Sequence, residues 1–182
     1  MGTPLPYGIR DIKLTAFTDQ AGTVLAATSV DLPYARTLSF SEVEDFTELR
    51  GDDKVVASHG SGPTAEWDME SGGLPFEAFQ LMAGGEITET GTAPDLVTIY
   101  AKKTTDTRPW FRIEGQAISD SGGDVHCIIS KAKATGDLSG EFTDGDFFLT
   151  AASGVGIGNE TDDLYSFVNN VAVTPFVEPG VA

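Results

Sequence analysis

An unbroken alternation of apolar and acidic residues, AEWDME at 65–70, constrains the fold of this chain more than any other feature. Successive side chains of a β-strand point to opposite faces, so the pattern predicts a strand whose buried face carries Trp67 and Met69. The opposite face then carries three acidic side chains, Glu66, Asp68 and Glu70. Same-face neighbours lie about 7 Å apart, where two carboxylates repel by about 0.6 kcal/mol in water and about 2.4 kcal/mol at an effective dielectric of about 20. We therefore expect this face to meet water or a cation, or to be protonated, and not to meet a dry protein surface.

The charge of the whole chain narrows the classes of partner. The 182 residues include 28 acidic and 11 basic side chains, which gives a formal net charge of −17. Such a charge opposes an electrostatic grip on nucleic acid or on an anionic membrane, although nucleic acid can still pass nearby. The single cysteine, Cys127, allows no internal disulfide and fits a cytosolic origin. We see no signal-type segment or membrane-length apolar run and expect no membrane association.

The remaining pattern predicts strands separated by turns that are rich in glycine and proline, of which the chain has 21 and 9. Strands are expected at residues 9–17, 23–27, 37–49, 55–59, 64–70, 95–103, 110–119, 125–134, 147–155 and 164–173, with turns at 136–146. One helix is expected at 74–83, because Pro75 suits its first turn, Gly84 and Gly85 end it, and one face would carry Phe76, Phe79, Met82 and Ala83. This order predicts a mainly β (α+β) fold, an antiparallel β-sandwich or small barrel with one short flanking α-helix. The length suits one domain, 1–182, and we expect its N- and C-terminal arms to be ordered against neighbouring copies.

The acidic residues do not form a convincing ligand site. A calcium-type spacing links four of them, Glu66, Asp68, Glu70 and Glu77. The loop would need a glycine where Ser71 stands, and Pro75 interrupts it. A pair of catalytic carboxylates would need to face each other across a cleft with aromatic platforms, and Trp67 is expected to point away. We therefore expect a solvated face with neither metal nor catalytic acid.

Other residues that often carry chemistry have ordinary structural interpretations. His126 and Cys127 are adjacent, so on a strand they point apart and form no dyad with each other. Cys127, in phase with Val125 and Ile129, is interpreted as a small core residue. Two histidines and one cysteine are too few for a structural zinc site. The glycine-rich run at 154–158 leads into acidic residues instead of a helix, which is unsuited to phosphate. We expect no catalytic residue and no cofactor.

Two long segments carry a recognisable succession of features. Residues 46–85 (FTELRGDDKVVASHGSGPTAEWDMESGGLPFEAFQLMAGG) place a charged hairpin before a strand ending E-S-G-G-L and a short helix that ends in glycine. Residues 112–154 place an S-D-S-G-G-D turn before a K-x-K-x-x-G strand and an F-x-D-x-x-F segment. This succession resembles the major tail tube proteins of long, non-contractile-tailed bacteriophages. The resemblance covers most of the chain and rests on the order and character of segments, not on a catalytic signature.

The resemblance implies a tail-tube type of β-sandwich whose copies join edge to edge into rings, usually of six, that stack into a tube. It implies an acidic lumen that gives passing double-stranded DNA nothing to bind, lined by Glu42, Glu44, Glu48, Glu66, Asp68 and Glu70. The tip of the charged hairpin is expected to contact the next ring through Arg50, Asp52, Asp53 and Lys54. The implied partners are further copies, the tape measure protein, the tail terminator and the distal tail or baseplate proteins. The implied locations are the virion tail and, during assembly, the host cytoplasm.

Two other functions remain open. The inner tube protein of a contractile tail or injection system shares this fold and would differ by an outer sheath contact. An acidic β-sandwich binding module, for example for carbohydrate, would need an exposed aromatic platform. Trp67, Trp110 and Phe111 have the pattern of core residues, although Trp110 follows Pro109 and could be exposed. No sequence signature supports an enzyme.

Overall fold

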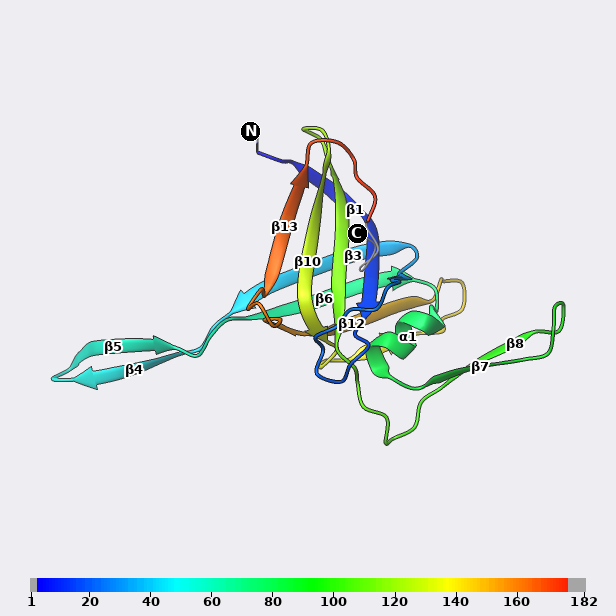
Figure 1. Cartoon of the computed structure of the whole chain (residues 1–182), viewed down its shortest axis with the longest axis horizontal. Coiled ribbons are helices and arrows are strands. Elements are labelled where there is room, and N and C mark those ends of the chain that lie inside the picture. The colour runs from blue at the N-terminus through cyan, green and yellow to red at the C-terminus, as the bar shows by residue number, and fades with distance from the viewer. Residues whose placement is uncertain (1–2, 177–182) are drawn as a thin grey trace.

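The computed structural model describes residues 3–176, which form thirteen strands and one helix (Figure 1). The first half contains β1 (Pro6–Ala16), β2 (Val30–Asp31), β3 (Ala35–Val43), β4 (Phe46–Gly51), β5 (Lys54–Gly60), β6 (Thr64–Gly72), α1 (Phe76–Ala83) and β7 (Glu86–Thr90). The second half contains β8 (Val97–Ala101), β9 (Phe111–Ser119), β10 (Asp124–Lys133), β11 (Leu138–Gly140), β12 (Leu149–Ile157) and β13 (Tyr165–Asn170).

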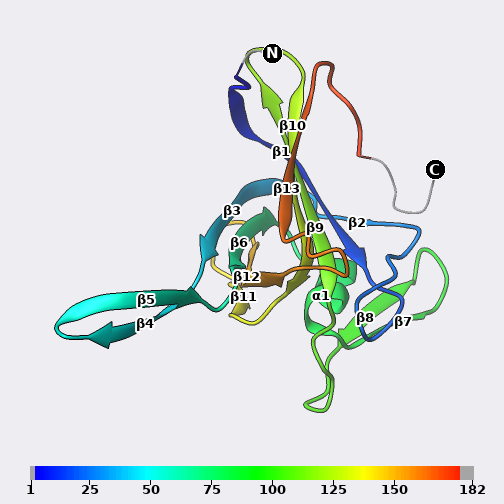
Figure 2. The ribbon, with the colours of Figure 1, turned by 60° about the vertical axis from the view of Figure 1, so that its left-hand side comes forward.

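The main sheet folds into two layers. Its strand order is β2-β1-β9-β10-β12-β6-β3, with β13 beside β10 and β11 beside β12, and the paired strands are antiparallel. Figure 1 shows β10 and β13 standing upright while β6 runs across them, and in Figure 2 the turned view shows β3 and β6 curving to one side of the upright strands. Strand β10 joins the layers, because residues 124–129 pair with β13 whereas residues 131–133 pair with β12. The predicted mainly β sandwich with one short flanking helix is confirmed.

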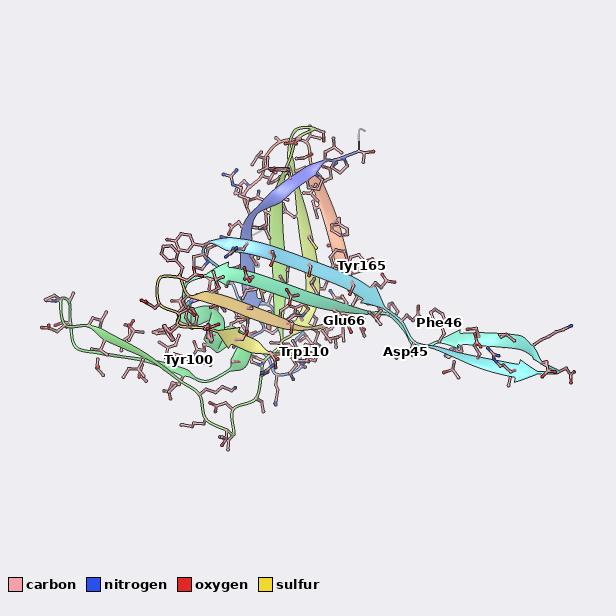
Figure 3. All side chains as sticks on the ribbon, turned by 180° about the vertical axis from the view of Figure 1, so that it is seen from behind. Asp45, Phe46, Glu66, Tyr100, Trp110 and Tyr165 are labelled. Atoms are coloured by element: carbon pink, nitrogen blue, oxygen red, sulfur yellow. The ribbon has the colours of Figure 1, made fainter. Side chains whose placement is uncertain are left out.

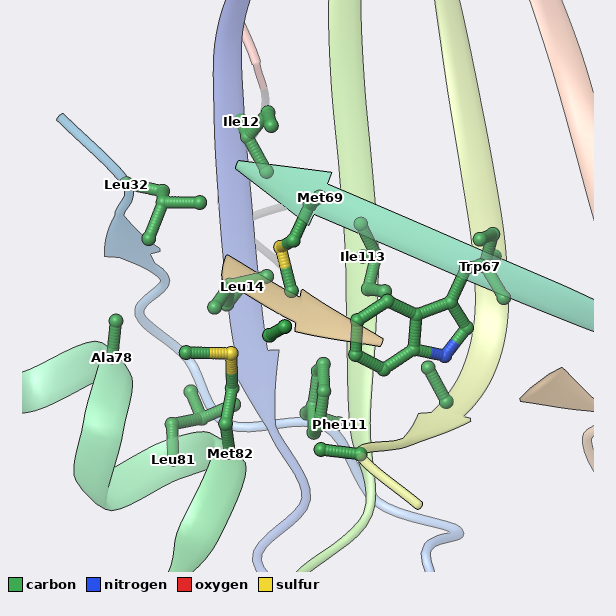
Figure 4. Packing of buried hydrophobic residues seen from close by; sticks show 14 residues of the cluster. Ile12, Leu14, Leu32, Trp67, Met69, Ala78, Leu81, Met82, Phe111 and Ile113 are labelled. Carbon is green, nitrogen blue, oxygen red and sulfur yellow. The ribbon is translucent and has the colours of Figure 1, made fainter. Parts of the chain in front are cut away.

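The core lies between the two layers and is closed at one end by α1 (Figure 4). The upright layer contributes Ile12, Leu14, Phe111, Ile113 and Ile129, and the crossing layer contributes Trp67, Met69 and Ala152. Each of these residues either alternates along its strand with more exposed neighbours or packs against a buried residue of the other layer. This is the pattern of a two-layer β fold. Trp67 and Phe111 are core residues, as predicted, while Trp110 is half-buried.

Helix α1 starts two residues later than predicted and buries a partly different face. Its buried residues are Ala78, Leu81, Met82 and Ala83, whereas Phe76 and Phe79 are half-buried. Both phenylalanine rings pack instead against Tyr100 of β8, with centroids 6.4 and 5.9 Å from the tyrosine ring. Of the predicted apolar face, Met82 and Ala83 are buried in the core, whereas Phe76 and Phe79 contact the base of β7–β8. The helix contacts two partners, so its apolar residues spread around more than one face.

Several strand boundaries differ from the sequence-based expectation. The predicted strand 37–49 is divided at Glu44 and Asp45 into β3 and β4. Residues 23–27 do not form a strand; only Leu25 makes an isolated bridge, with Phe17. Strands β2, β7 and β11 were not predicted. Short strands such as these carry too little pattern of their own and depend on pairing with a neighbour.

Two hairpins extend from the body as separate two-stranded sheets. Among residues 3–176, the first arm, β4–β5, and the second arm, β7–β8, are each paired only within themselves. Figure 1 shows them projecting on opposite sides of the molecule. The expected terminal arms fall partly on residues 1–2 and 177–182, which lie outside the described residues. No helix in the described range is long and apolar enough to cross a membrane.

Candidate functional site

The acidic alternation forms β6, and its two faces differ as the sequence predicts. On the inner face Ala65, Trp67 and Met69 are 0%, 2% and 1% exposed. On the outer face Glu66 and Asp68 are exposed and Glu70 is half-buried. Figure 3 shows Glu66 on the crossing layer, near the end from which the first arm leaves. The strand therefore presents three carboxylates on the side of the sheet that faces away from the core.

The strands on either side of β6 add hydroxyl and small side chains to this outer face. Glu66, Asp68 and Glu70 lie opposite Ser41, Ser39 and Thr37 of β3. On the other side they lie opposite Val155, Ser153 and Ala151 of β12. Directly opposite residues in antiparallel strands share a face, so these nine side chains form one surface, which we call the acidic face. None of the six neighbouring positions is basic.

Basic side chains approach the acidic face only at its margins, as far as residues 3–176 show. Arg36, at the bulge where β3 begins, places its Nε 3.1 Å from Glu70 Oε1. Beyond β12, Lys131 and Lys133 of β10 lie with their Nζ atoms 5.3 and 5.0 Å from the centroid of the Trp110 ring. A groove of about 410 Å³ runs over the centre of the face, between Ser39, Asp68 and Ser153. The centre of the face is thus acidic and polar.

Glu42 does not belong to the acidic face, contrary to the expectation. It lies opposite Ala65, so it shares the inner side of the sheet with Trp67. Its Oε2 accepts a hydrogen bond from the Tyr165 hydroxyl at 2.8 Å, beside an aromatic group of Tyr165, Phe40 and Phe167. The reason is the register. Even-numbered residues of β6 lie opposite odd-numbered residues of β3, so even-numbered acids in the two strands point to opposite sides.

The other two predicted acids also lie apart from the acidic face. Glu44 follows β3 and accepts the backbone N–H of Gly62 at 3.3 Å, at the base of the first arm. Glu48 lies on β4 and pairs with Arg50, whose Nη2 is 2.8 Å from Glu48 Oε2. Of the six acids predicted together, the fold brings together Glu66, Asp68 and Glu70.

The first arm carries the predicted tip residues and an unexpectedly apolar surface. Asp52 and Asp53 occupy the turn with φ of 52° and 61°, between the paired residues Gly51 and Lys54. This is a two-residue hairpin turn of the type that requires positive φ at both positions. Along the arm four large apolar side chains are exposed by 49–65%: Phe46, Leu49, Val55 and Val56. A two-stranded hairpin in water is marginally stable at best, so this arm lacks the support that a partner surface supplies.

The second arm was not predicted as a projecting unit. Leu96, Val97 and Ile99 are 48%, 52% and 48% exposed on it. At its base the Tyr100 hydroxyl donates to the carbonyl of Gly84 at 2.7 Å, which ties the arm to the end of α1. The sequence signal that could have located β7 is the alternation of Ile87 between acidic and threonine residues, which is too short to stand out.

The sheet that carries the acidic face has two edges without a strand partner among residues 3–176. Strand β3 pairs only with β6, and β11 pairs only with β12. They lie on opposite sides of β6 and β12, so the strand order across the face is β11-β12-β6-β3. Unpaired edges present rows of N–H and C=O groups that can add a strand from another chain.

The other chemically reactive residues take ordinary positions. Cys127 is half-buried among Ile9, Leu38 and Phe167, and this burial raises the pKa of its thiol to about 11. His126 hydrogen-bonds to Asp124 and Glu114 and not to Cys127. Within residues 3–176, no group of three or more histidine, cysteine or acidic side chains is arranged to hold a metal ion.

Sequence reasoning missed two further groups. One is an exposed aromatic group at a groove of about 710 Å³, lined by Tyr34 and Phe147, which are exposed by 81% and 88%. Phe142, 85% exposed, packs against Phe148 of the same groove, with the ring centroids 4.6 Å apart. The other is the buried polar set of Glu114, Gln116, Asp124 and His126. Its signal was present as polar residues at alternate positions of two neighbouring strands.

Comparisons with known proteins assign no family. No protein-family model matches the sequence, and the search of curated proteins finds no match. The features of the molecule that bear on function are the acidic face, the two unpaired sheet edges and the two arms.

Proposed function

We propose that this protein is a self-assembling structural subunit whose copies form stacked rings, the tube of a bacteriophage tail. One observation carries the proposal: the acidic face lies at the centre of a sheet whose two outer strands, β3 and β11, both lack partners among the described residues. Copies placed side by side can pair β3 of one with β11 of the next, so that the sheet closes into a ring. Closure removes the exposed edges and turns one face of every copy inward.

The chemistry of the acidic face suits the inner wall of such a ring. Double-stranded DNA carries about one negative charge per 1.7 Å of its axis, so it is repelled by Glu66, Asp68 and Glu70. The neighbouring hydroxyl and small side chains offer no cation for a phosphate. Water and counterions in the bore keep the mutual repulsion of the carboxylates near its lower value of about 0.6 kcal/mol per pair. The role of the charge is to let DNA pass without binding.

The arms suit contacts between copies. The apolar side chains of β4–β5 and β7–β8 have too little cover within one subunit, and a second copy can supply it. At the tip of the first arm, Arg50, Asp52, Asp53 and Lys54 carry both signs of charge, which suits a contact of defined register with the next ring. The corresponding partners of a complete tail are the tape measure, terminator and distal tail or baseplate proteins. An inner tube of a contractile tail would use the same contacts.

One observation favours a second candidate, a binding module. The exposed rings of Tyr34 and Phe147 border the groove of about 710 Å³ and offer the aromatic platform that sugar recognition needs. In this candidate the protein stays monomeric, and its acidic face serves solubility.

Negative-stain electron microscopy of the purified protein over a range of raised concentrations distinguishes the two candidates. We expect rings or tubes with an open centre. A strict monomer at every concentration, with retention on a carbohydrate array, would replace the tube proposal by the binding module. The even-numbered residues of β6 bond β3, so Ser39, opposite Asp68, bonds β6, whereas Glu42, opposite Ala65, directs its N–H to the free edge of β3. Substituting Glu42 by Pro removes this edge N–H and serves as an assembly-deficient comparison, because proline cannot donate to a strand ladder.

A further inference from the structure

A cluster of ionisable side chains is buried on the outer face of the upright layer, remote from the acidic face. Glu114, Gln116, Asp124 and His126 are 8%, 5%, 0% and 5% exposed. They come from adjacent strands, with Gln116 of β9 opposite His126 of β10. Buried charges are costly unless they are paired, so the arrangement of their partners indicates what this cluster holds in place.

The imidazole of His126 lies between two carboxylates. Its Nε2 is 2.9 Å from Asp124 Oδ2, and its Nδ1 is 3.2 Å from Glu114 Oε1. An ionised carboxylate only accepts hydrogen bonds, and a neutral imidazole has one N–H, so both contacts are satisfied only by the protonated ring. Arg112 adds a second cation, with its Nη2 2.9 Å from Glu114 Oε2. Two carboxylates and two cations balance in charge while the ring is protonated.

The cluster binds the main chain of the segment that follows β13, residues 171–176. The backbone N–H of Thr174 donates to Asp124 Oδ2 at 3.0 Å, and Gln116 Nε2 donates to the Thr174 carbonyl at 2.9 Å. The Phe176 ring lies over His126, with the centroids 4.9 Å apart. Burial raises the pKa of Asp124, but the hydrogen bonds from Thr174, Gln116 and His126 outweigh it and hold that pKa well below its ordinary value.

Few other charges face this cluster from the neighbouring elements. On β1, Asp11 and Lys13 lie opposite Gln116 and Glu114, and Lys13 Nζ is 5.8 Å from the centroid of the Phe176 ring. On β2, Asp31 lies opposite Lys13. The residues of β13 opposite His126 and Asp124 are the uncharged Val168 and Asn170, and residues 171–176 carry no charge. The protonated ring of His126 places a cation 2.9 Å from Asp124 Oδ2.

We propose that Asp124, His126 and Glu114 form a protonation-controlled latch that holds residues 171–176 against the sheet. With the ring protonated, Asp124 is charge-compensated and accepts the Thr174 N–H. When the ring loses its proton, one ring nitrogen turns a lone pair toward a carboxylate oxygen, and the buried cluster keeps an uncompensated negative charge. The segment then separates and water reaches Asp124. The latch therefore holds while the His126 ring is protonated, and it opens as a rising pH removes the ring proton.

The test uses nuclear magnetic resonance on the full chain across a pH series. The ring nitrogen shifts of His126 report its protonation, and the exchange of the Thr174 amide, corrected for base-catalysed intrinsic exchange, reports the latch. We expect the protection of this amide to fall about tenfold or more over the same pH interval in which the ring is deprotonated. Protection that stays constant while the ring titrates would overturn the latch.

Two variants control for general effects of pH. His59→Gln changes the chain's other histidine, on the first arm, and should leave the wild-type response intact. His126→Gln should show low Thr174 protection at every pH, and full protection in this variant would also overturn the proposal. If His126→Gln does not fold, the wild-type and His59→Gln series still decide the question. The latch is independent of the proposed tube, because its test is made on the full chain at concentrations below those at which rings or tubes form.

Discussion

Trp67 and Phe111 pack edge to face in the core, with the ring centroids 5.7 Å apart and the planes at 74°. Trp67 comes from the crossing layer and Phe111 from the upright layer, so this contact joins the two halves of the sandwich. The approach also depends on Gly154, where an added Cβ would lie 2.7 Å from the indole ring. The geometry is the edge-to-face arrangement that aromatic pairs prefer.

Replacing Trp67 by Ala should lower the free energy of unfolding by about 3–5 kcal/mol, because it removes a fully buried ring and leaves a cavity. Trp67→Phe should cost less, since the buried indole N–H has no hydrogen-bond partner among residues 3–176 and its loss leaves no acceptor there unsatisfied. Urea denaturation followed by circular dichroism measures both values. Trp110→Ala, at a half-buried position, is the matched control. Equal losses for Trp67→Ala and Trp110→Ala would contradict the central role of the contact.

Changing Glu66, Asp68 and Glu70 together to Lys should allow assembly but should make the assemblies retain DNA. The change removes three repulsive charges and adds three phosphate partners on the proposed inner wall. The cost in folding should be small, because Glu70 loses only its partly exposed pair with Arg36, worth about 0–1 kcal/mol. Co-sedimentation with double-stranded DNA at low and physiological salt measures retention.

The control for that variant makes the same charge change elsewhere. Asp120, Asp144 and Glu160 are exposed loop residues away from the acidic face, and their replacement by Lys gives the same net charge. If this control retains DNA as strongly as the triple variant on β6, the position of the charges does not matter and the inner-wall assignment is wrong.

Reversing the charges at the tip of the first arm, Arg50→Glu with Lys54→Glu, should leave a folded monomer that polymerises poorly. The variant loses both cations of the tip, including the partner of Glu48, while the arm's backbone pairing is unchanged. Sedimentation velocity with electron microscopy measures the outcome. Arg10→Glu with Lys103→Glu is the matched control, because these exposed basic residues lie outside the first arm and their replacement makes the same change in net charge. Normal tubes from the charge-reversed variant would remove the tip contact from the proposal.

Cys127 should react slowly with iodoacetamide at pH 8 in the native protein, by a factor of about ten or more relative to the urea-unfolded chain. Burial raises the thiol pKa to about 11, so little thiolate forms at that pH. The same shift affects stability: the contribution is fully present below the ordinary thiol pKa and is lost as the pH rises through about 11. Mass spectrometry of timed samples gives the rates, and Cys127→Ala supplies the blank. Equal native and unfolded rates would show that the thiol is freely accessible.

The sequence predicted best where a pattern is long and lies within one element. The alternation at 65–70 identified β6, the burial of Trp67 and Met69, and the outward direction of its three acids. Prediction from the sequence failed where the structure of a segment depends on contacts between two elements. The break at Glu44 and Asp45 is invisible in a run of strand-forming residues, and the exposed faces of the two arms cannot be distinguished from core strands by composition.

By itself, the sequence determined the class of fold, the position of the short helix and the two-sided character of β6, because period and glycine placement act on neighbouring residues. Only the tertiary structure decided which acids share a face, because the register of β3 against β6 places Glu42 beside Ala65 on the inner side. It also decided that Glu114, Asp124 and His126 are buried, since residues 171–176 fold back over them after β13. Strand register and the covering of one segment by another depend on contacts between distant residues, and no local pattern encodes them.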